Sequence, residues 1–435
     1  MKNLIISQIN DRNFTVGIIG LGYVGLPLSL RFVEVGFKVI GFDIDPEKVK
    51  QLNQGETYIK HIGQERVFTA WETGRFFATN DFSKASETDA LILCLPTPLG
   101  EHKDPDLSFV INSLNCVLPY LKKGQIISLE STTYPGTTEE ELKPMIESKG
   151  LEIGEDIFLI YSPEREDPGN ANFTTKNIPK VVGGITNNCL EIGVILYQSI
   201  VDKVIPVSST QVAEMSKILE NIYRAINISL VNELKMVTDQ MGIDIWEVIA
   251  AAATKPFGFT PFYPGPGLGG HCIPIDPFYL TWKAREYGIN TRFIELAGEV
   301  NINMPHWVIT KVSEALNHHS KAVKNCKVLV LGVAYKKNID DLRESPALEL
   351  IKLLKEREAI IFYCDPYILQ LPKTRKYDFN LESVEITAEL LQEMDCILIA
   401  TDHDQFDYDL IQQHSKLIVD TRGRYKSKFS NVVKA

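Results

Sequence analysis

Between Phe14 and Asp45 the apolar positions change their period twice, in the sequence FTVGIIGLGYVGLPLSLRFVEVGFKVIGFDID. A short apolar run is followed by apolar positions at helical spacing and then by a second apolar run. This order predicts a βαβ unit with parallel strands. Four further apolar runs have the length of buried strands: Ala90–Leu95, Gln125–Leu129, Ile157–Tyr161 and Val204–Pro206. Residues 1–205 are therefore expected to form one doubly wound, Rossmann-like domain.

From about Ser209 the apolar positions recur at helical spacing over roughly 30 residues, which predicts a helix about 45 Å long. These positions are Val212, Met215, Leu219, Ile222, Ile226, Leu230, Leu234 and Val237. One domain does not need such a length, so we expect this helix to bridge two domains and to be a candidate dimer seam. Helical spacing resumes over Tyr279–Tyr287 and again to about Ala315, and residues 206–315 are read as a central helical domain.

A second α/β pattern begins at Cys326, in CKVLVLGVAYK. A helix is predicted over Ser345–Glu358, with Ser345 as its N-cap and Pro346 in its first turn. Strands are predicted at Ala359–Cys364, Cys396–Ala400 and Leu417–Val419. The expected fold class is α/β, with two Rossmann-like doubly wound domains joined by the central helical domain and its long bridging helix. Residues 316–435 form the third domain.

Composition restricts the possible partners of the chain. Its 435 residues carry a formal net charge of −11, which leaves no basic surface for nucleic acid or an anionic membrane. No apolar run reaches the length of a membrane span or of a signal-peptide core, so we expect a cytoplasmic protein. The seven cysteines are scattered without a CxxC or CxxH pair, which favours reduced thiols and predicts no metal site.

Three glycines, Gly20, Gly22 and Gly25, form a G-x-G-x-x-G pattern where the first predicted strand turns into a helix. Such glycines permit a tight turn, close approach of a pyrophosphate, and close helix–strand packing. Asp43 ends the second strand, where a carboxylate can hold a ribose 2′-hydroxyl and repel a 2′-phosphate. The pattern predicts NAD as cofactor; the alternative is a turn that binds nothing. The predicted cofactor site also includes the turn residues Tyr23 and Val24.

Polar residues follow the later strands, at the sheet edge where ligands collect in such folds. In YSPEREDPGN, Glu164 is a candidate general acid or base, and Arg165 could hold an anion. Thr97, Glu130 and Thr132 follow two other strands and are candidates for the cofactor side.

Cys272 lies in the segment YPGPGLGGHCIPIDPFYL, directly after Gly269, Gly270 and His271. A lone cysteine is most often a small buried apolar residue, but flanking glycines and a polar neighbour suit a nucleophile beside a ligand. Asp276 precedes a proline, which is typical of a helix N-cap, and it could equally take part in catalysis.

Lys217 and Asn221 lie four residues apart on the long predicted helix and therefore share one face. Together they can donate hydrogen bonds to a developing alkoxide. The alternative is a solvated lysine on a helix surface.

Taken together, these motifs resemble those of the UDP-glucose/GDP-mannose dehydrogenase family over nearly the full chain. The matching pieces are GLGYVGLPL, LPTPL, ESTTYPGT, SPERE, AEMSKILEN, GLGGHCIPIDP, VLGVAYKKNIDDLRES and DTRG. The resemblance implies a four-electron oxidation with two NAD⁺, in which Cys272 captures an aldehyde as a thiohemiacetal and then forms a thioester that water cleaves. Independently of the resemblance, the long helix and the third domain suggest a homodimer or a higher homo-oligomer.

The resemblance also assigns roles to the other candidate residues. Lys217 and Asn221 correspond to the oxyanion-stabilising pair, Asp276 and Thr132 to the pair that orders a catalytic water, and Glu164 to the carboxylate of thioester hydrolysis. The turn Tyr263–Gly269, with Tyr263, Gly265, Gly267 and Gly269, resembles the loop over the sugar and pyrophosphate. Lys336 and Arg422 correspond to UDP contacts, and Arg343 to a contact that reaches NAD.

Departures from the family pattern bear on the substrate. Glucose-specific members usually carry serine and lysine where this chain has His271 and Ile275, and an apolar residue where it has Arg165. These positions favour the branch that acts on UDP-N-acetylhexosamines, and UDP-N-acetylglucosamine is the preferred substrate. UDP-N-acetylmannosamine, UDP-N-acetylgalactosamine and UDP-glucose stay open. The product would serve surface polysaccharide, such as lipopolysaccharide O-antigen.

Two other functions compete with this interpretation. A two-electron dehydrogenase of the hydroxyacid type shares the cofactor domain but does not require Cys272. A silent NAD-binding scaffold would have no need for the thiol, the lysine and the amide together.

Overall fold

The computed structural model describes the chain except for residues 60–61, 101, 167–172, 271–272 and 375. The described residues divide into two compact units. Unit 1 comprises Met1–Glu220 and Phe278–Ile289; unit 2 comprises Asn221–Pro277 and Asn290–Ala435. The division falls within two helices, α8 (Thr210–Gln240) and α10 (Asp276–Glu286).

Unit 1 is built on an eight-stranded sheet in the order β3-β2-β1-β4-β5-β6-β7-β8. Neighbouring strands are parallel except for β6 and β7, which are antiparallel. The strands are β1 (Thr15–Ile19), β2 (Lys38–Phe42), β3 (Phe76–Thr79), β4 (Ala90–Leu93), β5 (Ile126–Leu129), β6 (Phe158–Tyr161), β7 (Lys180–Gly184) and β8 (Val204–Pro206). The chain reverses its direction of winding between β1 and β4, which is where ligands bind in open α/β sheets.

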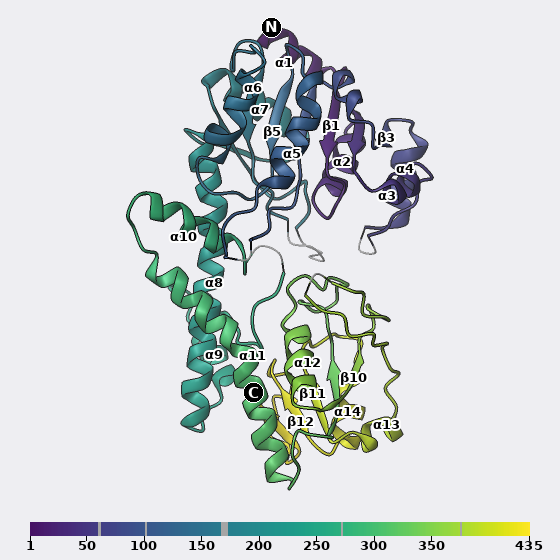
Figure 1. Ribbon diagram of the computed structural model, residues 1–435, viewed down its shortest axis with the longest axis vertical. Helices are drawn as coiled ribbons and strands as arrows, with labels where there is room; N and C mark the ends of the chain where they lie inside the picture. The colour runs from purple at the N-terminus through teal and green to yellow at the C-terminus, as the bar shows by residue number, and fades with distance from the viewer. Residues whose placement is uncertain (60–61, 101, 167–172, 271–272, 375) are drawn as a thin grey trace. The chain divides into compact units, whose positions relative to one another are not determined.

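Helices cover the sheet of unit 1, in the purple to blue part of the ribbon (Figure 1). They are α1 (Lys2–Asn10), α2 (Gly25–Glu34), α3 (Pro46–Leu52), α4 (Gln64–Glu72), α5 (Ser108–Val117), α6 (Lys143–Glu147) and α7 (Asn187–Gln198), with short turns η1 (Phe82–Glu87), η2 (Leu118–Tyr120) and η3 (Thr138–Leu142). Every residue of β4, β5 and β6 is buried. This explains why these strands read as continuous apolar runs rather than as alternating patterns.

Unit 2 contains a five-stranded parallel sheet in the order β10-β9-β11-β12-β13. Its strands are β9 (Lys327–Leu331), β10 (Ile360–Cys364), β11 (Cys396–Ile399), β12 (Ile418–Asp420) and β13 (Val432–Lys434). The remaining helices of this unit are α9 (Ile245–Ala252), α11 (Arg292–His318), α12 (Pro346–Glu356), α13 (Ala388–Glu393) and α14 (Tyr408–His414). The C-terminal half of α11 packs into the same core as β9 and α12, through Val308 and Val312.

The structure confirms the predicted α/β fold class: a doubly wound sheet that is parallel except for β6 and β7, a second doubly wound sheet that is parallel throughout, and the long helix α8. Helix α8 has 31 residues, and the Ser345 side chain caps α12 by accepting from the Ala347 amide. Sequence patterns missed β3, β7, β13 and the helix α1. Strand β7 ends in two glycines that break the apolar pattern, and Gly184 is required because a Cβ there would lie 2.3 Å from the Leu190 nitrogen. Within the described residues, no helix has both the length and the apolarity that a membrane crossing demands.

Candidate active site

The glycine turn after β1 has the geometry that the G-x-G-x-x-G pattern predicts. Gly20 has φ +92°, and its amide donates to the Phe42 carbonyl at 2.8 Å. A Cβ on Gly25 would lie 1.8 Å from the Gly20 carbonyl oxygen, so helix α2 can pack this close only with glycine. A Cβ on Gly22 would meet no heavy atom within 4 Å among the described residues. The open space at Gly22 is where a pyrophosphate can approach the backbone, so this turn fits a dinucleotide.

Asp43 is held against this turn from the end of β2. Its carboxylate accepts the Leu21 amide at 3.0 Å and the Asp45 amide at 3.0 Å, and Lys48 lies 3.7 Å away. The Tyr58 hydroxyl donates to the Leu21 carbonyl, and burial, helped by the charge of Asp43, raises the pKa of Tyr58. Asp43, the residue predicted to bind the ribose, is therefore held beside the glycine turn by hydrogen bonds from backbone amides.

The edge after β5 and β6 holds a buried ion pair that sequence patterns did not reveal. Glu130 is fully buried, lies 2.6 Å from the Lys180 ammonium, and accepts a hydrogen bond from the Tyr197 hydroxyl. Burial raises the pKa of Glu130, and Lys180 opposes that shift. Thr97, predicted for the same side, is also buried. Lys180 and Tyr197 come from β7 and α7, far along the chain, so no local motif announces them.

Glu164 and Arg165 line a pocket at this edge together with Glu130, Glu166 and Lys180. Arg165 pairs with Glu220 at 2.6 Å and donates to the Pro179 carbonyl at 2.7 Å, so its guanidinium is already engaged in unit 1. Burial and the neighbouring Glu164 raise the pKa of Glu166 to about 7. The pocket thus holds a carboxyl group that titrates near neutrality.

Helix α8 is anchored to the segment that follows β5. Glu214 is fully buried and accepts from the Gly136 amide at 2.6 Å and from the Thr138 amide at 2.9 Å. Thr132, half-buried, lies in the segment between β5 and these contacts. Lys217 follows on α8 with an exposed fraction of 4%, and its ammonium has no hydrogen-bond or ion-pair partner in the described part of the chain. The structure therefore excludes the reading of Lys217 as a solvated surface residue.

Asn221 and Asp276 meet in unit 2. Asn221 is fully buried, and its side-chain NH2 group donates to an Asp276 carboxylate oxygen. The Arg224 guanidinium donates to the side-chain oxygen Oδ1 of Asn221. Asp276 is the first residue of α10 and is also buried. Cys272 and His271 lie outside the described residues.

The glycine segment that precedes Cys272, residues 263–270, contacts two other parts of unit 2 at Gly265. The Gly265 amide donates to Asn232 at 3.0 Å, and Asn232 in turn donates to Asn301 at 2.9 Å. A Cβ on Gly265 would lie 2.7 Å from an Arg422 terminal nitrogen. Tyr263, one of the predicted substrate residues, is 55% exposed.

Further along, the same segment packs on the C-terminal α/β part of unit 2. Gly267 has φ +134°, and a Cβ on Gly269 would lie 2.5 Å from the Tyr335 Cβ. The Gly270 amide donates to the Arg343 carbonyl at 2.8 Å. The Arg343 side chain pairs with Asp341 at 2.7 Å.

Lys336 and Arg422 follow β9 and β12 at the carboxyl edge of the second sheet. Lys336 is half-buried, and the Nε of Arg422 donates to the Ala400 carbonyl at 2.7 Å. The structure thus brings Gly265 next to Arg422, and it brings Gly269 and Gly270 next to Tyr335, which directly precedes Lys336.

Three family models match the chain in order. They describe the NAD binding domain (residues 14–201), the central domain (residues 211–303) and the UDP binding domain (residues 329–427) of the UDP-glucose/GDP-mannose dehydrogenase family. The chain belongs to this family. It is an NAD-dependent nucleotide-sugar dehydrogenase, as the resemblance of its motifs implied, and the glycine turn with Asp43 lies within its NAD binding domain.

Individual relatives extend over most of the chain. It is 37% identical to a UDP-N-acetyl-D-glucosamine 6-dehydrogenase of Pseudomonas aeruginosa, over 82% of this chain and 84% of the relative. It is 34% identical to an NDP-N-acetyl-D-galactosaminuronic acid dehydrogenase of Ralstonia nicotianae, over 95% and 97%. The solved UDP-D-ManNAc dehydrogenase of Pyrococcus horikoshii superposes with a TM-score of 0.87 at 29% identity, covering 97% of this chain and 98% of that one.

Proposed function

We propose that this enzyme oxidises the C6 hydroxyl of a UDP-N-acetylhexosamine, with UDP-N-acetylglucosamine as the preferred substrate, to the corresponding uronic acid. The observation that carries this proposal is the burial of the Lys217 side chain, which is 4% exposed and has no hydrogen-bond or ion-pair partner in the part of the chain that the structure describes. A buried cation is costly without a counter-charge, so its retention points to an anion that forms during turnover.

The proposed reaction passes through two oxidation steps and one hydrolysis. NAD⁺ supplies the hydride acceptor for both oxidations. Between them, the Cys272 sulfur adds to the aldehyde carbon to give a thiohemiacetal, and the second oxidation turns this into a thioester. Water then cleaves the carbon–sulfur bond, which releases the acid and restores the thiol. In total, one alcohol and one water become one carboxylic acid while two NAD⁺ become two NADH and two protons leave.

The other predicted catalytic residues stabilise negative charge on the substrate oxygen or position the water that hydrolyses the thioester. Lys217 and Asn221 stabilise the oxygen that becomes negative in each step. Asp276, with Thr132, orders the water that attacks the thioester, and Glu164 accepts its proton. The Asn221–Asp276 hydrogen bond supports this division because it holds the amide and the carboxylate at one buried position.

Cofactor and substrate would be held by different parts of the chain. We assign NAD to residues 1–205, the cysteine loop to residues 206–315 and the UDP sugar to residues 316–435, in line with the three matched family domains. The residues proposed to contact NAD are Gly20, Gly22, Tyr23, Val24, Gly25, Asp43, Thr97, Glu130 and Arg343. Those proposed to contact the UDP sugar are Arg165, Tyr263, Gly265, Gly267, Gly269, Lys336 and Arg422.

The choice of sugar rests on sequence. His271 and Ile275 stand where glucose-specific members usually carry serine and lysine, and the relatives compared above are named for three different N-acetylated sugars. N-acetylglucosamine is preferred because the relative with 37% identity acts on it. The mannosamine and galactosamine epimers, and UDP-glucose, are the alternatives.

We further propose that the enzyme works in the cytoplasm, in the synthesis of surface polysaccharide, as a homodimer or larger homo-oligomer. Support for self-association comes from α8: Tyr223, Leu230, Leu234 and Val237 recur on one face of its unit 2 part and are each at least 40% exposed.

The test is the NADH formed per sugar consumed, measured at saturation on UDP-glucose and the three UDP-N-acetylhexosamines. A ratio near two with an N-acetylated sugar is expected. Cys272→Ser should stop acid formation while NAD still binds, and Cys116→Ser, at an exposed cysteine, is the matched control. A ratio near one, or full turnover by Cys272→Ser, would contradict the proposed reaction.

A further inference from the structure

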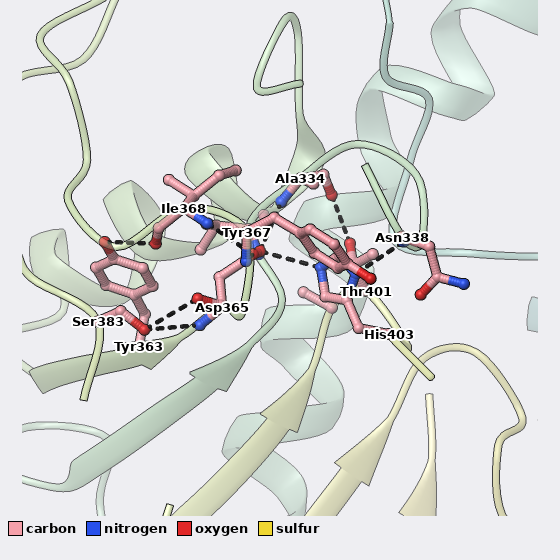
Figure 2. A network of polar contacts seen from close by, with 12 residues as sticks. Ala334, Asn338, Tyr363, Asp365, Tyr367, Ile368, Ser383, Thr401 and His403 are labelled. Atoms are coloured by element: carbon pink, nitrogen blue, oxygen red, sulfur yellow. Dashed lines mark hydrogen bonds and ion pairs between the residues drawn. The ribbon is translucent and has the colours of Figure 1, made fainter. Parts of the chain in front are cut away.

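Asp365, directly after β10, is a fully buried carboxylate that accepts five hydrogen bonds. The donors are the amides of Val333 (2.7 Å), Ala334 (3.2 Å), Tyr367 (2.8 Å) and Ile368 (3.1 Å), and the His403 ring at 3.0 Å. Figure 2 shows these contacts converging on the carboxylate. A carboxylate offers about four lone-pair sites, so Asp365 has no acceptor capacity left for a ligand.

In this respect Asp365 differs from Asp43, the aspartate at the equivalent position in unit 1. Asp43 also ends the second strand of its sheet and accepts the amide that follows a positive-φ glycine. Gly332 repeats the turn, because its φ is +74° and its amide donates to the Cys364 carbonyl at 2.9 Å, as Gly20 donates to Phe42. Asp43 has oxygen capacity for a ribose, whereas Asp365 uses its capacity on its own backbone. The equivalent position in the second sheet is therefore occupied by a structural carboxylate rather than by one that is open to a ligand.

His403 completes the arrangement from the loop after β11. Its ring is fully buried; Nδ1 accepts the Asn338 amide at 2.9 Å, and Nε2 donates to Asp365. An Nδ1 that accepts must lack a proton, so the proton is on Nε2. Nδ1 therefore holds one end of a short segment directly, and Nε2 holds the Asp365 carboxylate that accepts from the amides at the other end.

That segment, residues 333–338, is fixed along its length. Asp365 holds its first two amides, His403 holds its last, and the Thr401 hydroxyl donates to the Ala334 carbonyl at 2.6 Å. Between these fixed points lie Tyr335 and Lys336. Val333 and Ala334 cannot shift without breaking a buried hydrogen bond, which costs about 1–3 kcal/mol for each group left unsatisfied.

Tyr335 connects residues 333–338 to the glycine segment that precedes Cys272, because it packs directly against Gly269 and Gly270. Its ring lies 3.0 Å from where a Cβ on Gly270 would be, and its Cβ lies 2.5 Å from the same position on Gly269. Only glycine allows an approach this close. A displaced Tyr335 would therefore displace the backbone of Gly269 and Gly270 as well.

We propose that the buried His403–Asp365 pair is a positioning element that holds residues 333–338 in the conformation required for UDP-sugar binding. Lys336 is thereby set at the UDP side, and Tyr335 sets the glycine segment. This inference rests on the proposed function, because it takes Lys336 as a UDP contact. His403 itself touches no substrate in this scheme.

The experiment measures UDP binding by calorimetry, NAD binding by fluorescence, and KM for both substrates, on the full-length enzyme. His403→Ala should weaken UDP binding and raise KM for the UDP sugar by about tenfold or more, since small displacements in binding groups have effects of this size. NAD binding in unit 1 should be unchanged. His403→Gln keeps a donor for Asp365 and His403→Asn keeps an acceptor for the Asn338 amide, so each should recover part of the loss.

Two further variants guard against a folding defect. Thr401→Val conserves volume and removes only the bond to Ala334, so it should weaken UDP binding in a protein that stays folded and loses no more than about 1–3 kcal/mol of stability. His318→Gln, at an exposed position, should change nothing. Unchanged UDP affinity in His403→Ala, or equal losses of UDP and NAD affinity in all three His403 variants, would overturn the positioning role. If the wild type itself does not bind UDP, the proposed function fails instead.

Discussion

Asn221 donates a hydrogen bond to the carboxylate of Asp276, and both side chains are buried. Asp276 is at the same time the first residue of α10, followed by Pro277 in the first turn. The sequence left open whether this aspartate caps a helix or takes part in catalysis. The structure places it inside the helix rather than at the predicted N-cap position, and its carboxylate accepts a hydrogen bond from Asn221.

Asp276→Asn should separate the two tasks. Asparagine serves a helix N-terminus about as well as aspartate, so stability should change by less than about 0.5 kcal/mol. Turnover should fall by about 100-fold or more, because the amide cannot handle a proton. Asp276→Ala should lose a further 1 kcal/mol or so of stability. The measurements are kcat and urea unfolding. Asp407→Asn, at the N-cap of α14, is the control and should keep full turnover. An equally active Asp276→Asn would leave Asp276 with a role at the start of α10 alone.

Lys217→Met keeps the length of the buried side chain and removes its charge. If the ammonium stabilises an oxyanion, kcat should fall by about 100- to 1,000-fold. The protein should keep its stability, because methionine fills the same buried space and the lysine makes no hydrogen bond or ion pair with the described residues. Lys149→Met, at an exposed position, should leave both quantities unchanged. Turnover near the wild-type rate would remove Lys217 from the mechanism.

The pocket carboxyl Glu166 should make stability depend on pH. Burial raises its folded pKa from 4.5 to about 7, so its favourable contribution is fully present below pH 4.5 and is lost as pH rises through about 7. Glu166→Gln has no group that titrates here, so it does not lose this contribution. Between pH 4.5 and about 7 its free energy of unfolding should rise relative to that of the wild type by up to about 3 kcal/mol. Urea unfolding at several pH values measures the difference. Glu155→Gln, exposed, should follow the wild type; parallel curves for Glu166→Gln would refute the shift.

Local patterns were enough to predict the glycine turn, the position of Asp43 at the end of the second strand and the Ser345 cap. Each of these depends on residues close together in the chain. The pairs Glu130–Lys180 and Asp365–His403 could not be predicted in this way. Their members come from strand ends and loops that only the sheet order brings together, and neither a buried glutamate nor a buried histidine differs in sequence from an exposed one. Lys217 illustrates the same limit: its i,i+4 relation to Asn221 was readable, but its burial was not.

The apolar positions of α8 show that periodicity alone does not reveal what covers a helix. Leu230 and Leu234 fit the predicted helical pattern, yet they are 52% and 40% exposed. Because a symmetric dimer presents the same patch twice, two copies of this face could bury each other, and burying the exposed half of each leucine would contribute about 1 kcal/mol.

Replacing both residues, in Leu230→Lys/Leu234→Lys, should therefore shift the protein toward a smaller species in light scattering coupled to size-exclusion chromatography. NAD binding should persist, because the glycine turn lies in unit 1, and Glu155→Lys should retain the wild-type mass. Lysine at these positions would place like charges opposite each other across the seam, which adds repulsion to the lost burial. A wild-type mass retained by the double variant would locate self-association elsewhere on the chain, and a monomeric wild type would leave this face of α8 without the proposed role.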